Sequence, residues 1–202
     1  MWPVVVLLPV AYLLGTFPSA VLVARSRGID ITAEGSGNPG ASNVIRVLGW
    51  KVGAVVLVFD CAKGAAAGGL GLWVGGRPGA SALGVAAVLG HTFPMLRRGG
   101  KGVAAAGGML LVLYPIVAAV LAVVWGVIAR GLRKASFASL LITIAFPITV
   151  ALLRYDWWET AVVSVISLLL VVRHASNIRR LVRREEHDLV GGSAPPRRRP
   201  AA

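Results

Sequence analysis

The chain has 202 residues, 56% of them hydrophobic, with a mean hydropathy of +0.77 and a formal net charge of +13 at pH 7. Long apolar runs at this density exclude an ordinary soluble domain and predict a polytopic membrane protein. Because the cations lie between the apolar runs, we expect anionic lipid headgroups and an anionic substrate as partners, and no nucleic acid.

The first predicted membrane helix is 3–24, since a span needs about 20 apolar residues. No cation precedes it, so we interpret it as a span with the N-terminus outside rather than as a cleaved signal peptide. A polar, glycine-rich segment at 25–51 follows. Two further spans are predicted at 52–74 and 80–96, on either side of the short turn "GGRPG".

The next apolar run, 103–129, is too long for one simple span and is interrupted by Pro115. We therefore predict two short helices in this region and two spans after it, at 102–114, 115–130, 136–153 and 158–172. All but three of the 21 Lys and Arg residues then lie on the cytoplasmic side, as the positive-inside bias favours. The prediction is an all-α integral membrane protein of about seven transmembrane helices, N-terminus out and C-terminus in.

The composition changes near the end of the chain. Residues 1–189 are expected to form a single membrane-embedded domain. Residues 190–202 are basic and rich in proline and glycine, which predicts a disordered tail with a weak attraction to lipid.

The segment "GSGNPGASNVIR" (35–46) has the G-x-G-x-x-G spacing of a dinucleotide-binding turn. That motif needs a preceding strand and a βαβ unit, and the flanking residues leave room for neither. What remains is the chemistry of a phosphate-binding loop. Its glycine N–H groups can converge on an anion, Ser36, Asn38 and Asn43 add neutral donors, and Arg46 adds a planar charged group suited to phosphate.

The segment "GHTFPMLRRGGKG" (90–102) repeats this pattern. Gly99, Gly100 and Gly102 surround Lys101 at the start of a predicted helix, whose N-terminus favours an anion. It is not a Walker A motif, because the upstream glycine spacing and the Ser or Thr after the lysine are missing. Two such loops on one face of the membrane indicate that the protein binds phosphate groups.

The segment "RHASNIRRLVRREE" (173–186) places His174 and Asn177 within one helical turn. The sequence leaves open whether His174 is a general base, a hydrogen-bond donor to phosphate, or an interfacial residue. Glu186 is expected to belong to a solvated network of ion pairs. Asp60 and Lys63, three residues apart inside a predicted span, are expected to pair or to face a polar cavity.

Several kinds of chemistry are excluded. No serine lies in a nucleophile elbow, and Cys61 has no activating neighbour, so no residue suits a covalent acyl-enzyme. The His-x-x-x-x-Asp pair of acyl-CoA-dependent glycerolipid acyltransferases is absent. The chain also lacks the clustered aspartates of a CDP-alcohol phosphotransferase, and we expect no metal and no cofactor.

Read together, "SGNPGASNVIR", "GHTFP…GGKG" and "HASNIRRL" resemble the motifs of the acyl-phosphate:glycerol-3-phosphate acyltransferase family of bacterial membranes. The resemblance is collinear from about residue 11 to residue 187. It implies transfer of a long-chain acyl group from acyl phosphate to the sn-1 hydroxyl of glycerol 3-phosphate. The products would be lysophosphatidic acid and phosphate, in the first step of phospholipid synthesis.

The resemblance also implies roles for individual residues. Gly99 to Gly102 would cradle glycerol 3-phosphate, Ser139 would contact a phosphate, and Glu186 would serve structure. The expected catalytic residues are Ser36, Arg46, His174 and Asn177, and the expected substrate-binding residues are Asn38, Asn43, Gly99, Gly100, Lys101, Gly102 and Ser139.

The expected location is the bacterial inner membrane, with the active site at the cytoplasmic face. The expected partners are glycerol 3-phosphate, acyl phosphate, membrane lipids and the soluble enzyme that makes acyl phosphate. The alternative is a transporter of an organic phosphate. Transport is disfavoured because the polar residues gather at one face, with only Asp60 and Lys63 deep in the membrane.

Overall fold

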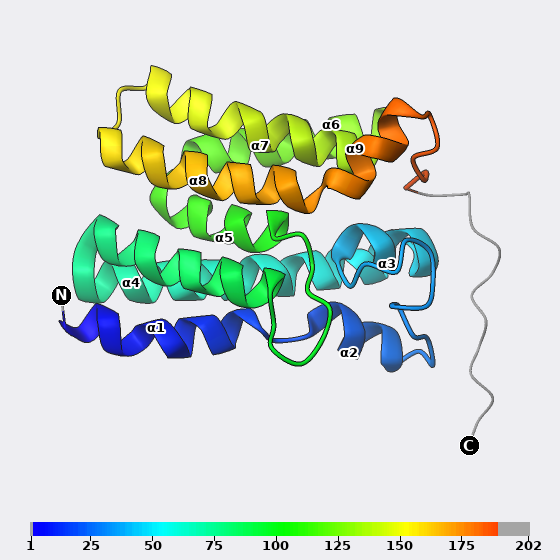
Figure 1. Ribbon diagram of the computed structural model, residues 1–202, viewed down its shortest axis with the longest axis horizontal. Coiled ribbons are helices and arrows are strands. Elements are labelled where there is room, and N and C mark those ends of the chain that lie inside the picture. Colours follow the sequence, from blue (N-terminus) through cyan, green and yellow to red (C-terminus); the bar gives the residue numbers. More distant parts are fainter. Residues whose placement is uncertain (1, 190–202) are drawn as a thin grey trace.

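The computed structural model describes residues 2–189, which form nine helices and contain no strand (Figure 1). The tail predicted at 190–202 lies outside the described residues. The helices are α1 (Trp2–Gly15), α2 (Ser19–Arg25), α3 (Ala41–Leu48), α4 (Trp50–Thr92), α5 (Val103–Leu113), α6 (Pro115–Gly131), α7 (Ala135–Leu152), α8 (Trp157–Arg173) and α9 (Ala175–Val182).

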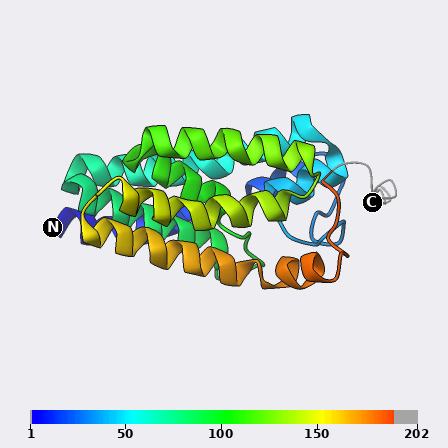
Figure 2. The ribbon, with the colours of Figure 1, turned by 90° about the horizontal axis from the view of Figure 1, so that it is seen from above.

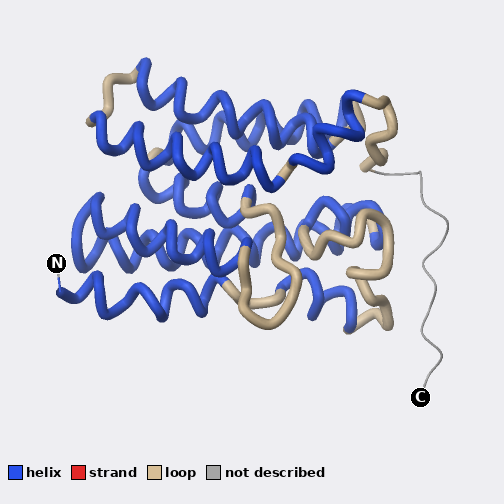
Figure 3. The backbone as a smooth tube through the Cα atoms, viewed as in Figure 1, coloured by secondary structure: helices blue, strands red, loops and turns tan. Residues whose placement is uncertain are grey.

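The long helices lie side by side along the long axis of the molecule, and this arrangement persists after a quarter turn (Figures 1 and 2). The short helices α2, α3 and α9 gather at one end, which we call the site end. Most of the irregular backbone lies toward the same end (Figure 3). The fold therefore brings the polar segments that the sequence singled out to one end of a helical bundle.

Helix α4 is a hairpin of two antiparallel stretches. Its backbone leaves helical geometry at Gly75 and Gly76, and Gly76 has a φ of 61°, which favours glycine. Next to this turn the two stretches touch, because a Cβ at Gly71 would lie 2.2 Å from the carbonyl oxygen of Gly79. The turn predicted at "GGRPG" is confirmed, although the second stretch ends at Thr92 and not at residue 96.

Small residues also allow α4 and α5 to pack closely. A Cβ at Gly64 would lie 1.9 Å from the carbonyl oxygen of Ala105, and one at Gly108 would lie 1.9 Å from that of Cys61. In lipid the hydrophobic effect does little to drive helices together, so close backbone contact supplies much of the association energy. These glycines fix the distance between the two helices whose ends border the site.

The first predicted span, 3–24, is not one continuous helix. Helix α1 ends at Gly15 and α2 begins at Ser19, with an irregular link between them. Pro18 has no N–H to donate to the helix ladder. The predicted break before Pro115 is confirmed, since α5 ends at Leu113 and Pro115 is the first residue of α6.

Three stretches are long and apolar enough to cross a membrane, namely Trp2–Arg25, α4 and α7. Helices α8 and α9 pass the same criterion only as a pair, bent by 59°. Helices α5 and α6 are shorter apolar helices. Because α4 is a hairpin, it contains two antiparallel apolar stretches. The number and length of the apolar helices are those of an integral membrane protein.

A buried polar cluster lies far from the site end. The Glu159 carboxylate, 2% exposed, accepts hydrogen bonds from Arg77 and from the Tyr114 hydroxyl at 2.9 Å. Arg77 also donates to the carbonyl oxygen of Leu113 at 3.1 Å. A buried carboxylate is costly unless it is paired, so these contacts stabilise the junction of α4, α8 and the break between α5 and α6.

Candidate active site

A cavity of about 220 Å³ opens among the helices at the site end. It is lined by every predicted site residue except Gly99 and Gly100, namely Ser36, Asn38, Asn43, Arg46, Lys101, Gly102, Ser139, His174 and Asn177. These residues come from four separate stretches of the chain. The structure therefore gathers the three sequence motifs and the start of α7 around one space.

Asn43 holds the first motif in shape. Its side chain is 1% exposed, and its Oδ1 accepts hydrogen bonds from the N–H of Ser36 at 2.9 Å and from Nη1 of Arg46 at 3.1 Å. Its Nδ2 donates to the carbonyl oxygens of Ile31 at 3.2 Å and Glu34 at 2.9 Å. Both ends of the side-chain amide are thus engaged within the protein, and Asn43 positions Ser36 and Arg46 against the cavity.

Asn177 links the second and third motifs. Its Oδ1 accepts a hydrogen bond from Nζ of Lys101, while its Nδ2 donates to Oε1 of Glu186 at 2.8 Å. Arg180 donates from Nε to the other carboxylate oxygen of Glu186 at 2.9 Å. The amide can satisfy both neighbours in only one orientation, because Lys101 donates and Glu186 accepts.

Glu186 corrects one expectation from the sequence. It is 5% exposed and is not part of a solvated network, whereas its neighbour Glu185 is exposed. The carboxylate is buried because Asn177 and Arg180 satisfy both of its oxygens. Its carboxylate lies close enough to Arg46 and Lys101 to interact with their positive charges.

Burial in the site changes the pKa of the two cations that line the cavity, Lys101 and Arg46. Burial lowers the pKa of Lys101 to about 8, and the nearby Glu186 carboxylate opposes that shift. Burial also lowers the pKa of Arg46, with the same carboxylate opposing it. Both side chains are charged at neutral pH, so the cavity presents two positive groups to an anion.

His174 lies at the junction of α8 and α9 and is 3% exposed, inside the protein rather than at its surface. Its Nδ1 lies 2.8 Å from the carbonyl oxygen of Leu170. A carbonyl oxygen only accepts, so Nδ1 carries the proton and Nε2 keeps its lone pair. Burial lowers the pKa of His174 to about 4, so the ring is uncharged at neutral pH.

The glycines of the second motif allow the Lys101 loop to pack closely against His91 and Thr92 at the end of α4. A Cβ at Gly100 would lie 2.1 Å from Nε2 of His91, and one at Gly99 would lie 2.1 Å from the carbonyl oxygen of Thr92. Gly102 has a φ of 89°, in the region that favours glycine. Close packing, rather than direct exposure to the cavity, explains why Gly99 and Gly100 are glycines.

Asp60 and Lys63 form a buried ion pair, and Asp60 also lines the cavity, so both alternatives predicted from the sequence hold for Asp60. Its Oδ1 lies 2.8 Å from Nζ of Lys63 and accepts a hydrogen bond from the Ser19 hydroxyl at 2.5 Å. His91, the residue against which Gly100 packs, has its Nδ1 3.6 Å from the same oxygen. The cluster joins α2, both stretches of α4 and the Lys101 loop on one side of the cavity.

Trp125 is a cavity residue that sequence analysis missed, because it is one aromatic residue in an apolar run. Its Nε1–H donates to Oγ of Ser139 at 3.0 Å. The hydroxyl proton of Ser139 is therefore free to be donated elsewhere. Ser136, one helical turn earlier, lines the same cavity with a buried hydroxyl that has no hydrogen-bond partner among the described residues. Two hydroxyl groups at the start of α7 can thus serve a ligand.

The cavity also has an apolar part. Side chains of the helices enclose it there, among them Leu57, Val103, Ala122 and Ile142. One space therefore combines cations and hydroxyl groups with a surface suited to a hydrocarbon chain. Among residues 2–189 no group of three or more His, Cys, Asp or Glu side chains is arranged to hold a metal ion.

Comparison with known proteins agrees with this architecture. The model of the family described as glycerol-3-phosphate acyltransferase matches residues 5–184. A glycerol-3-phosphate acyltransferase of Thermus thermophilus is 39% identical over 179 residues, which cover 85% of this chain and 87% of the relative.

Solved structures of PlsY, an integral membrane glycerol 3-phosphate acyltransferase, have the same fold. The glycerol 3-phosphate form superposes with a TM-score of 0.86 at 35% identity, covering 92% of this chain and 95% of that one. The lysophosphatidic acid form superposes with a TM-score of 0.83 at 34% identity and the same coverage. The chain therefore belongs to the glycerol-3-phosphate acyltransferase family of integral membrane acyltransferases.

Proposed function

We propose that the protein transfers a long-chain acyl group from acyl phosphate to the sn-1 hydroxyl of glycerol 3-phosphate, releasing lysophosphatidic acid and inorganic phosphate. The observation that carries this proposal is the single cavity that joins two cations and several hydroxyl groups to an apolar surface. An acyl phosphate has a charged phosphate and a hydrocarbon tail, and glycerol 3-phosphate brings a second phosphate to the same charged end. The cavity suits this pair of substrates.

In this proposal Arg46 and Lys101 neutralise the two phosphates. Ser36, Asn38 and Ser139 donate hydrogen bonds to phosphate oxygens. Asn177 and Asn43 hold the cations in place through the contacts described above. Gly99, Gly100 and Gly102 give the Lys101 loop the shape that presents Lys101 and Gly102 to glycerol 3-phosphate in the cavity.

The proposed reaction is a direct transfer without an acyl-enzyme. The sn-1 oxygen attacks the acyl carbonyl carbon, a new C–O ester bond forms, and the bond between that carbon and the bridging phosphate oxygen breaks. The electron pair of the broken bond leaves with inorganic phosphate. Acyl phosphate is already an activated mixed anhydride, so the protein mainly supplies positioning and charge stabilisation.

The proton of the attacking hydroxyl has two candidate acceptors, a phosphoryl oxygen or Nε2 of His174. Burial lowers the pKa of His174 and makes its ring a poor base, whereas the phosphoryl oxygens of the substrates carry negative charge. We therefore infer that a phosphoryl oxygen takes the proton. Nε2 of His174 is then left to accept a hydrogen bond from the second hydroxyl group of glycerol 3-phosphate, which orients the substrate.

We also propose seven membrane spans, with the N-terminus outside and the site end at the cytoplasmic face of the bacterial inner membrane. The cations and the short helices at the site end support this orientation. Glycerol 3-phosphate and the soluble enzyme that makes acyl phosphate would both have access from the cytoplasm. Accessibility of single cysteines placed at positions 77 and 98 to a membrane-impermeant reagent tests the orientation.

The activity is tested with purified protein, radiolabelled glycerol 3-phosphate and palmitoyl phosphate, using palmitoyl-CoA as the control donor. We expect 1-acyl lysophosphatidic acid from palmitoyl phosphate and none from palmitoyl-CoA. Product formed only from palmitoyl-CoA would contradict the proposed donor. Product acylated at the second hydroxyl would contradict the proposed position.

A further inference from the structure

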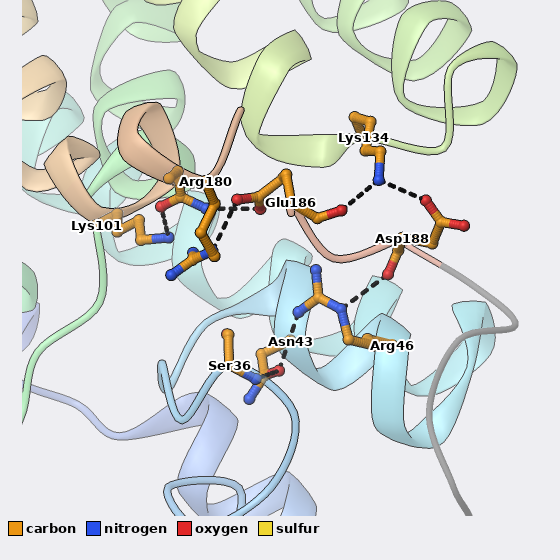
Figure 4. A network of polar contacts seen from close by, with 9 residues as sticks. Ser36, Asn43, Arg46, Lys101, Lys134, Arg180, Glu186 and Asp188 are labelled. Atoms are coloured by element: carbon orange, nitrogen blue, oxygen red, sulfur yellow. Dashed lines mark hydrogen bonds and ion pairs between the residues drawn. The ribbon is translucent and has the colours of Figure 1, made fainter. Parts of the chain in front are cut away.

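The last four described residues, Glu186–Leu189, cross the site end as an irregular segment that we call the strap (Figure 4). At one end of the strap, the Glu186 carboxylate is bound by Asn177 and Arg180 of α9. At the other end, the Leu189 side chain is 1% exposed and packs in a cluster with Ile45 of α3 and with residues of α6 and α7. The strap is thus fixed to four helices.

The strap contacts the cavity through Arg46. Nε of Arg46 donates to the main-chain carbonyl oxygen of Asp188 at 2.8 Å. Nη1 of the same guanidinium donates to Asn43 at 3.1 Å. Figure 4 shows the guanidinium lying between these two acceptors. Because the group is planar and rigid, two contacts in different directions fix its orientation.

Lys134, immediately before α7, fastens the strap. Its Nζ donates to the carbonyl oxygen of Glu186 and lies 2.8 Å from Oδ1 of Asp188. The N–H of Leu189 donates to the carbonyl oxygen of Arg133 at 2.6 Å. The strap is therefore paired with the two residues that immediately precede α7, the helix that carries Ser139.

We propose that the strap positions the Arg46 guanidinium for catalysis, and that the ion pair between Lys134 and Asp188 is the fastening on which this depends. Asp188, Lys134 and Leu189 are positioning residues, since none of them lines the cavity. This positioning of Arg46 deepens the proposed function. It rests on that function in one respect, namely that Arg46 binds a substrate phosphate. It assigns a function to a segment 142 residues away from Arg46 in sequence.

The substitution Asp188→Asn distinguishes a positioning role of the strap from a purely electrostatic role of Asp188. Asp188→Asn keeps the main-chain carbonyl that Arg46 uses and removes a negative charge near an anion-binding cavity. If Asp188 acted only through its charge, this variant would bind anionic substrates more tightly. If it fastens the strap, kcat falls, because a small displacement of a phosphate-binding cation is costly. We expect a fall of about tenfold.

The test compares kcat and KM for Asp188→Asn, Asp188→Glu and Leu189→Ala with wild type, with Val182→Ala as the matched control. Val182 is 80% exposed on α9, outside the strap, and its variant keeps wild-type activity. Asp188→Glu keeps the charge and retains more activity than Asp188→Asn. The ion pair is about a third exposed, so Asp188→Asn leaves Tm nearly unchanged.

A double-mutant cycle with Arg46→Lys then asks whether the strap acts through Arg46. In the Arg46→Lys background no Nε remains at that position, so Asp188→Asn lowers kcat by less than about twofold. Additive losses, or wild-type activity of Asp188→Asn itself, would overturn the proposal. The cycle is measured with the donor that the wild-type protein uses, either palmitoyl phosphate or palmitoyl-CoA. A wrong donor assignment and a wrong assignment of the strap's role are therefore detected separately.

Discussion

The substitution Gly100→Ala tests whether the Lys101 loop must pack as the structure has it. The added Cβ would lie 2.1 Å from Nε2 of His91, whereas ordinary contact begins at 3.4 Å. The ring cannot turn into solvent, since His91 is 8% exposed and its Nδ1 lies 3.6 Å from the Asp60 carboxylate. The loop must therefore move by about 1.3 Å, the difference between these two distances.

That movement displaces Lys101, whose Nζ donates to Asn177 in the cavity. A misplacement of about 1 Å at a catalytic site costs on the order of 100-fold, or about 2.7 kcal/mol in transition-state stabilisation. We therefore expect kcat/KM of Gly100→Ala to fall by about 100-fold. The protein itself should fold, because the loop lies outside the helices that form the bundle.

The assay is lysophosphatidic acid formation at several concentrations of glycerol 3-phosphate, with Tm measured in the same detergent. Gly69→Ala is the matched control, because a Cβ at that helical position meets no atom within 4 Å. The double variant H91A/G100A removes the obstructing ring and should recover part of the lost activity. Wild-type kinetics for Gly100→Ala would refute the packing argument.

Three further predictions concern other contacts. Lys101 loses its charge as pH rises through a pKa of about 8, so KM for glycerol 3-phosphate should rise about tenfold from pH 7 to pH 9, while Lys101→Arg should show a flat profile. Asn177→Asp places a second carboxylate against Glu186, and single-turnover measurements should show a loss of about 100-fold. Glu159→Ala leaves Arg77 and the buried Tyr114 hydroxyl without their hydrogen-bond acceptor. Because Arg77 is 39% exposed, thermal unfolding should show a loss of only about 2 kcal/mol in the free energy of unfolding, and activity per folded molecule should be unchanged.

The residues around the cavity could be predicted because each motif carries a local chemical signal. Glycines beside serine, asparagine and a cation indicate phosphate binding wherever they occur, and charge bias indicated that the three motifs share one face. Ser36, Arg46, Lys101, His174 and Asn177 do line one cavity. Their spacing in sequence could not have given the distances between them.

The supporting contacts could not be predicted, because they join distant residues through main-chain atoms or through single side chains. The Arg46 contact to the carbonyl oxygen of Asp188 leaves no pattern in the sequence, since any residue has a carbonyl group. The bond from Trp125 to Ser139 depends on how α6 packs against α7. The burial of Glu186 was missed for the same reason, because arginines nearby in sequence suggested a solvated network instead.

The most direct test of acyl transfer from acyl phosphate is the stoichiometry of a single purified preparation. With palmitoyl phosphate and glycerol 3-phosphate together, we expect one lysophosphatidic acid and one inorganic phosphate per turnover. Without glycerol 3-phosphate, we expect no burst of phosphate, because no acyl-enzyme forms. Phosphate release without lysophosphatidic acid, or a burst without glycerol 3-phosphate, would contradict direct transfer in this cavity.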